Sequence, residues 1–130
     1  MNTVDTFRIF LHVLAASVWV GGQIVLAGLV PTVREIDPEA PRKVARAFNR
    51  LAWPAYGVAV VTGVWNLLDI PMEDPPYVEL GLKVLVVALS GIGAAVHQVA
   101  RGNRAMLAIG GAMSSLFGIA AMWIGVDLPI

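Results

Sequence analysis

Residues 7–30 read FRIFLHVLAASVWVGGQIVLAGLV, and this stretch decides the fold class. It holds one charged residue, Arg8, which lies at its edge. A helix needs roughly 20 apolar residues to cross a bilayer core about 30 Å thick. The run is continuous, without the alternation of barrel strands, and it is longer than the apolar core of about 7–15 residues in a signal peptide. We therefore predict a retained membrane-spanning helix.

Three further segments have the same character, at about residues 51–68, 80–99 and 105–126. Across these three segments, Lys83 is the only Lys, Arg, Asp or Glu residue. The chain of 130 residues is 58% hydrophobic and 14% charged, with mean hydropathy +0.76, whereas soluble domains carry about 25% charged residues. This balance excludes an ordinary soluble enzyme and a disordered chain. We predict an all-α integral membrane protein, in which residues 1–130 form a single four-helix up-down bundle.

The chain has a formal net charge of zero and no cysteine. Zero net charge gives no indication of nucleic-acid binding, so the expected surroundings are the lipid bilayer. Without cysteine, the protein cannot hold disulfides, thiolate metal sites or iron–sulfur clusters. The phosphate-binding loop, the serine-hydrolase elbow and the zinc-protease motif are also missing from the sequence, so nothing in it indicates a hydrolase.

Basic residues gather on one side of the predicted spans. They are Arg34, Arg42, Lys43, Arg46, Arg50, Arg101 and Arg104. Because cytoplasmic connections carry the excess of Lys and Arg, we predict that this side is cytoplasmic and that both termini lie outside. The predicted location is the bacterial inner (cell) membrane, with a multi-pass topology.

The first connection has helical character of its own. Asp37 is typical of a helix N-cap, with Pro38 at the first helical position. Apolar residues then recur at helical spacing, with Arg42, Arg46 and Arg50 on another face. We predict an amphipathic cytoplasmic helix over about residues 38–50 that runs into the second span. It is either a solvated extension of that span or a surface that binds anionic lipid.

Small residues recur at every fourth position of the last segment, at Gly110, Ser114 and Gly118. Such ridges let helices approach closely in lipid. The ridge serves either packing within the chain or a homodimer interface.

Ionisable residues inside membrane spans are costly, and they therefore point to function. His12 and Lys83 each lie a few residues into a span that begins outside, which places them at similar depth. His97 follows Lys83 by fourteen residues, or about 21 Å along a helix axis. We expect His97 at the opposite membrane face, in a plain interfacial role.

Two roles remain open for each of the outer pair. His12 is either a metal or heme ligand or an interfacial histidine bonded to a backbone carbonyl. Lys83 either reaches the surface and pairs with Glu79, or faces His12 and holds a metal or an anionic group. Asp69 lies at similar depth, and its carboxylate can act as a metal ligand or as the partner of one.

Residues Leu11–Gly22 resemble the first motif of the copper-resistance protein D (CopD) family. The likeness rests on His12, on Trp19 seven residues later, and on the two glycines that follow. The stretch Thr62–Asn66 is similar to the family's next helix, and the surroundings of Lys83 to its third. The related HemJ type of protoporphyrinogen oxidase shares the four-helix plan, with an equivalent histidine and lysine tied to heme b.

The resemblance implies an inner-membrane protein that binds or transports copper at His12, with Lys83, Asp69 and Met72 contributing. The alternative that it implies is a heme b protein with an oxidoreductase or electron-transfer role, in which His12 is an axial ligand and Lys83 the second ligand or a propionate partner. A third hypothesis is a cofactor-free structural subunit of a membrane complex, assembled through the small-residue ridge. Whether the chain is an enzyme stays open, and a non-enzymatic role is favoured.

Overall fold

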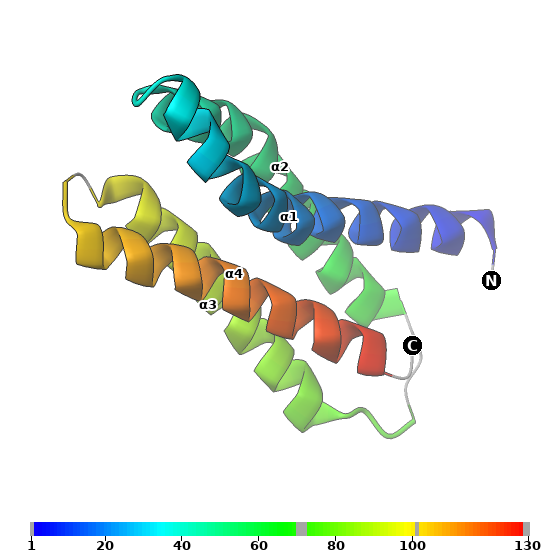
Figure 1. Ribbon diagram of the computed structural model, residues 1–130. Coiled ribbons are helices and arrows are strands. Elements are labelled where there is room, and N and C mark those ends of the chain that lie inside the picture. Colours follow the sequence, from blue (N-terminus) through cyan, green and yellow to red (C-terminus); the bar gives the residue numbers. More distant parts are fainter. Residues whose placement is uncertain (1, 70–72, 101, 129–130) are drawn as a thin grey trace. The chain divides into compact units, whose positions relative to one another are not determined.

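The computed structural model describes residues 2–69, 73–100 and 102–128, and all four of its described elements are helices. They are α1 (Thr3–Ile36), α2 (Ala40–Asp69), α3 (Tyr77–Val99) and α4 (Arg104–Asp127), shown in Figure 1. Each is long and apolar enough to cross a membrane. The predicted all-α class with four candidate spans is therefore confirmed, and the chain has the character of a multi-pass membrane protein.

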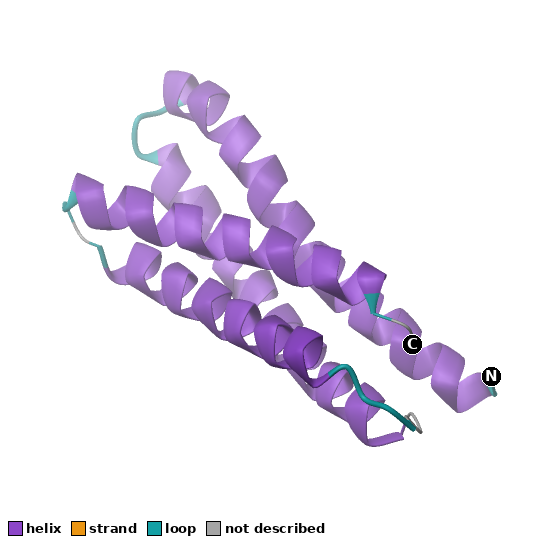
Figure 2. Cartoon of the chain, turned by 90° about the horizontal axis from the view of Figure 1, so that it is seen from below, coloured by secondary structure: helices purple, strands orange, loops and turns teal. Residues whose placement is uncertain are grey.

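The chain divides into two compact units, Met1–Pro71 and Met72–Ile130. The first unit contains α1 packed on α2, and the second contains α3 packed on α4. Within each unit a short stretch joins the two helices, residues 37–39 in the first unit, and Figure 2 shows the helices purple and the loops teal. Each unit is therefore a helical hairpin, and each is described by itself below.

Helix α1 extends beyond the predicted span at both ends. It begins at Thr3 and is capped by Asn2, whose side chain accepts from the backbone N–H of Asp5 at 2.9 Å, while the Asp5 carboxylate accepts in return from the N–H of Asn2 at 3.3 Å. It continues through Pro31 to Ile36, so the helix is longer than the span predicted over residues 7–30. One proline removes one backbone donor, and the neighbouring helical hydrogen bonds carry the chain past it.

The turn into α2 also differs from the prediction. Asp37 ends α1, with its N–H donating to the Val33 carbonyl at 3.1 Å, and its side chain accepts from the N–H of Glu39 at 3.0 Å. Helix α2 begins only at Ala40, two residues after the predicted start at Pro38. It then runs to Asp69 without a break, so the basic segment 40–50 and the second span form one helix.

An aromatic cluster and a glycine contact hold α1 against α2. The ring of Trp19 lies 5.1 Å from that of Trp53 and 4.6 Å from that of Tyr56, centroid to centroid. Trp19 is only 5% exposed. Nearer the loop, the Phe48 ring lies over Gly22, where an added Cβ would come within 2.5 Å of it. These contacts fix which faces of the two helices meet.

In the second unit, small residues let α3 and α4 approach closely. The hydroxyl of Ser90 donates to the Ser114 carbonyl at 2.7 Å, and a Cβ added to Gly110 would lie 2.5 Å from the His97 backbone nitrogen. Gly110, Ser114 and Gly118 are all buried. The ridge of small residues therefore serves packing within the chain, as the first of the two alternatives predicted, and nothing in the described residues supports a homodimer through it.

This packing predicts opposite effects for two glycines of α3. A Cβ at Gly93 would lie 2.6 Å from the Ser114 backbone nitrogen, whereas a Cβ at Gly81 would meet nothing within 4 Å. Gly93→Ala should lower the free energy of unfolding by about 1–3 kcal/mol. Gly81→Ala should leave it unchanged or raise it by up to about 1 kcal/mol, because alanine favours helix. Circular dichroism during unfolding in mixed detergent micelles measures both, and equal effects would contradict the close approach.

Candidate functional site

A charged cluster lies between α1 and α2 in the first unit. The Arg8 side chain, expected to be a charge at the edge of a span, is buried and only 2% exposed. Its Nε donates to Asn66 Oδ1 at 2.6 Å and its Nη1 to Asp69 Oδ2 at 2.9 Å. Its Nη2 lies 3.1 Å from Asp5 Oδ1. Each nitrogen of the guanidinium thus has a partner, which offsets the cost of burying the charge.

Trp65 completes this cluster. Its indole N–H donates to Asp69 Oδ2 at 2.7 Å, and the Arg8 guanidinium carbon lies 5.7 Å from its ring centroid, within cation–π range. One carboxylate oxygen of Asp69 therefore accepts from two donors. The residue predicted as a copper ligand is, in the structure, the anionic partner of Arg8 and Trp65.

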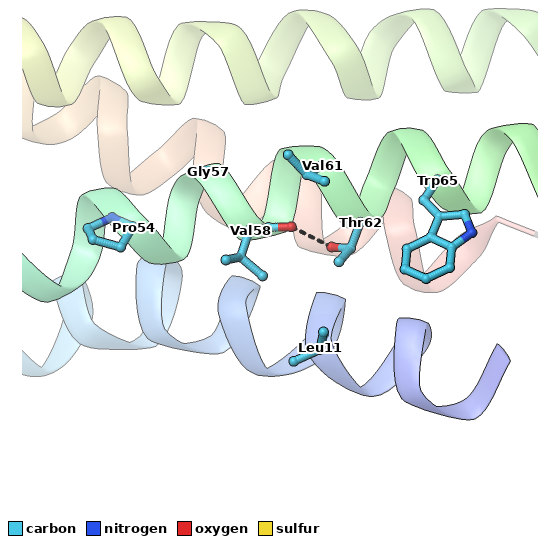
Figure 3. Close-up of a pocket in the computed structure, with 7 residues that line it drawn as sticks. All are labelled: Leu11, Pro54, Gly57, Val58, Val61, Thr62 and Trp65. Carbon is cyan, nitrogen blue, oxygen red and sulfur yellow. Dashed lines mark hydrogen bonds between the residues drawn. The ribbon is translucent and has the colours of Figure 1, made fainter. Parts of the chain in front are cut away.

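His12 lies one helical turn beyond Arg8 on α1. Its Nδ1 is 2.9 Å from the Ala59 carbonyl oxygen and 3.0 Å from Thr62 Oγ1. The Thr62 hydroxyl is itself 2.6 Å from the Val58 carbonyl, the bond drawn in Figure 3. A carbonyl can only accept, so the geometry assigns the proton of the imidazole to Nδ1. In the neutral ring the lone pair is then on Nε2, the nitrogen through which the ring can coordinate a metal.

Gly63 makes room for this ring. A Cβ at that position would lie 3.2 Å from His12 Cε1, the carbon between the two ring nitrogens. The stretch Thr62–Asn66, noted in the sequence only as part of a resemblance, thus supplies the acceptor for His12, the clearance beside it and the acceptor for Arg8. Position 62 and position 66 are one turn apart, so both face α1.

An apolar groove lies on the same helix pair as His12. Its lining residues are Leu11, Pro54, Gly57, Val58, Val61, Thr62 and Trp65, and its volume is about 440 Å³ (Figure 3). Thr62 links the two features, because it lines the groove and also bonds the imidazole. The groove therefore offers an apolar surface next to one partner of the candidate ligand.

The other predicted site residues belong to the second unit or lie outside the described residues. Lys83 is on α3, with Nζ 2.9 Å from the position of a Cβ on Gly125 of α4. His12 belongs to the first unit and Lys83 to the second, and their proximity remains a prediction. Met72 lies outside the described residues, as does Arg101 of the predicted basic side.

His97 repeats part of the His12 arrangement. Its Nδ1 is 2.7 Å from the Leu107 carbonyl oxygen, and a Cβ on Gly111 would lie 3.1 Å from that nitrogen. The ring is exposed. It has the backbone acceptor and the neighbouring glycine of His12, but no threonine hydroxyl is bonded to its Nδ1 among the described residues. The plain interfacial role of His97 stays a prediction.

In the part of the chain that the structure describes, His, Asp and Glu side chains form no group of three or more that could hold a metal ion. A single imidazole can serve as one of several donors to copper or as a protein ligand of heme iron. His12 therefore suits either centre as one of its ligands.

The Arg8 cluster predicts that two polar substitutions in this unit change the stability of the protein by different amounts. Asn66→Ala removes the acceptor of the buried Arg8 Nε and should cost about 1.5–3 kcal/mol, the range for hydrogen bonds to charged groups. Ser17→Ala removes only a local bond to the Val13 carbonyl at an exposed position, and should change stability by no more than about 0.5 kcal/mol. Thermal unfolding in one detergent compares them, and an Asn66→Ala cost as small as that of Ser17→Ala would contradict this role.

Comparisons with known proteins leave the function to be argued from this geometry. No protein-family model, no curated protein and no solved structure matches the chain. The likeness of Leu11–Gly22 to the CopD family therefore stays a resemblance, and the chemistry of His12 and its surroundings carries the argument below.

Proposed function

We propose that this chain is a multi-pass membrane protein that binds a metal centre through Nε2 of His12. The observation that carries the proposal is the bond from Nδ1–H of His12 to the Ala59 carbonyl at 2.9 Å. Metal-ligating histidines almost always donate their other ring N–H to a carbonyl or carboxylate, which fixes the tautomer and raises the basicity of the ligating nitrogen. The Thr62 hydroxyl adds a second acceptor and so restrains the ring further.

Heme b is the centre that we favour. The imidazole of His12 would hold it, and the groove lined by Leu11 and Thr62 offers an apolar surface. Heme would supply one-electron chemistry, while the protein's own residues orient the ligand and exclude water. Lys83 is the proposed second ligand or propionate partner. The resulting function is electron transfer or oxidoreduction in a membrane.

Copper binding or transport is the second candidate, and the pattern of His12, Trp19 and two glycines favours it through its likeness to the CopD family. Its remaining proposed donors are Lys83, Asp69 and Met72. Asp69 already accepts from Arg8 and Trp65, so a copper ion would have to share or displace those bonds. That cost is the reason for ranking copper after heme.

Three histidine and lysine variants test the proposal. His12→Ala should lower the bound heme, read from the Soret band of purified protein, by tenfold or more, because the ligand is lost. His97→Ala is the matched control, since that ring has the same kind of carbonyl bond, and it should keep full occupancy. Lys83→Ala should lower occupancy less if lysine acts through charge, and as much as His12→Ala if it is a direct ligand.

The same preparations separate the alternatives. A colourless protein with stoichiometric copper that His12→Ala removes would replace heme by copper. Loss of either cofactor in His97→Ala, with full retention in His12→Ala, would move the site to the other unit. Wild type without metal or heme would leave the cofactor-free structural subunit as the function.

We further propose that both termini face outward from a bacterial inner membrane. The support is the basic side formed by the α1–α2 and α3–α4 connections. Because the chain has no cysteine, one cysteine added after Ile130 can be labelled selectively. A membrane-impermeant maleimide should label it in intact cells. Labelling that appears only after the cytoplasmic side is opened would reverse this topology.

A further inference from the structure

Two polar contacts between α1 and α2 follow one another along the same seam. The first joins Arg8 Nε to Asn66 at 2.6 Å, and the second joins His12 Nδ1 to Thr62 at 3.0 Å. On each helix the step between them is four residues, or about 6 Å along the axis. Because the helices are antiparallel, moving one turn forward on α1 moves one turn back on α2. The Arg8 contact and the His12 contact therefore depend on the same axial register.

A small slide between the helices would break both contacts. The rise per residue is about 1.5 Å, so a slip of one residue would carry the 2.9 Å contact from His12 to the Ala59 carbonyl beyond hydrogen-bonding distance. The Arg8 contact resists such a slip strongly, because a planar guanidinium binds Asn66 and Asp69 in a rigid fork and is only 2% exposed. Displacement would leave a buried charge without partners.

Apolar packing fixes the register of such a pair only weakly. Between apolar helices in lipid there is little hydrophobic driving force, and interhelical hydrogen bonds add specificity. The aromatic cluster of Trp19, Trp53 and Tyr56 lies on the far side of His12 from Arg8. This cluster and the Phe48 ring over Gly22 are packing contacts that could also hold the register, and variants of the Arg8 bonds separate the two effects.

We infer that Arg8 is a positioning residue for His12. Its bonds to Asn66 and Asp69 set the register of α1 on α2, and that register keeps Nδ1–H of His12 on the Ala59 carbonyl and so presents Nε2. The importance of this for metal binding rests on the proposed function. The orientation and tautomer of His12 do not, and they can be measured in protein that carries no cofactor.

The test uses nitrogen NMR of detergent-solubilised full chain labelled with ¹⁵N-histidine, in alkaline buffer where both imidazoles are neutral. The chain has two histidines, and a His97→Gln sample assigns them. Wild type should show His12 mainly as the Nδ1–H tautomer. Arg8→Gln keeps a polar side chain but cannot reach all three partners, and it should shift the ratio of Nδ1–H to Nε2–H at His12 by about tenfold, the effect of losing one good hydrogen bond.

Two variants and an internal reference make the result decisive. Asp69→Asn weakens one of the bonds of Arg8 to α2 and keeps the other. It should shift the His12 ratio in the same direction by a smaller factor. Ser17→Ala is the matched control on α1, because it removes a bond within that helix only, and it should leave the ratio unchanged. The His97 tautomer should stay constant throughout, since its acceptor is Leu107 in the other unit.

The outcomes either support or overturn the inference. A His12 ratio unchanged in both Arg8→Gln and Asp69→Asn would show that the packing contacts between the two helices hold the register, and Arg8 would not be a positioning residue. If Arg8→Gln loses its helical signal, Asp69→Asn decides by the same criterion. A wild type that binds neither heme nor copper would defeat the proposed function, while the tautomer measurement would still decide the role of Arg8.

Discussion

The contact on which the first unit depends is the buried guanidinium of Arg8. In apolar surroundings a charge has to find its partners within the protein, and Arg8 finds them in Asp5, Asn66 and Asp69. The bonds to Asn66 and Asp69 join the start of α1 to the end of α2. They restrict how one apolar helix can sit on another, and the imidazole one turn away inherits that restriction. A local electrostatic requirement therefore determines the geometry of the candidate ligand.

Helix number and type follow from the sequence because lipid tolerates few alternatives. Backbone groups without water must be bonded internally, so long continuous apolar runs become helices. Helix ends were harder to predict, because Pro31 and Pro38 both signal a boundary in soluble proteins. In the structure α1 passes through Pro31, and α2 starts only after Pro38 and Glu39. The boundary lies instead at Asp37. Its N–H makes the last hydrogen bond to α1, and its side chain accepts from the N–H of Glu39 in the turn.

The candidate site was predictable in part. His12 could be selected because an ionisable residue inside a span is costly, and the same reasoning applied to Arg8 would have indicated a buried partner. The partners of Arg8 on α2 are 58 and 61 residues away in the sequence, and no local sequence pattern connects them to Arg8. Asn66 and Asp69 at helical spacing near the end of an apolar run were the available signal. The sequence predicts Asp69 as a metal ligand or the partner of one, because only the three-dimensional structure shows that it faces Arg8.

The two histidines show why one contact does not define a site. Both have Nδ1 on a backbone carbonyl, and both have a glycine one turn after that carbonyl beside the ring. A hydrogen bond to a carbonyl satisfies one ring nitrogen of an imidazole but does not by itself indicate a function. His12 differs in having a second acceptor, Thr62. It also lies one turn from the buried Arg8, whose bonds to α2 oppose sliding of one helix along the other. Coordination needs a lone pair held in a constant direction, and it is this restraint of the whole helix pair, more than the tautomer, that distinguishes His12 from His97.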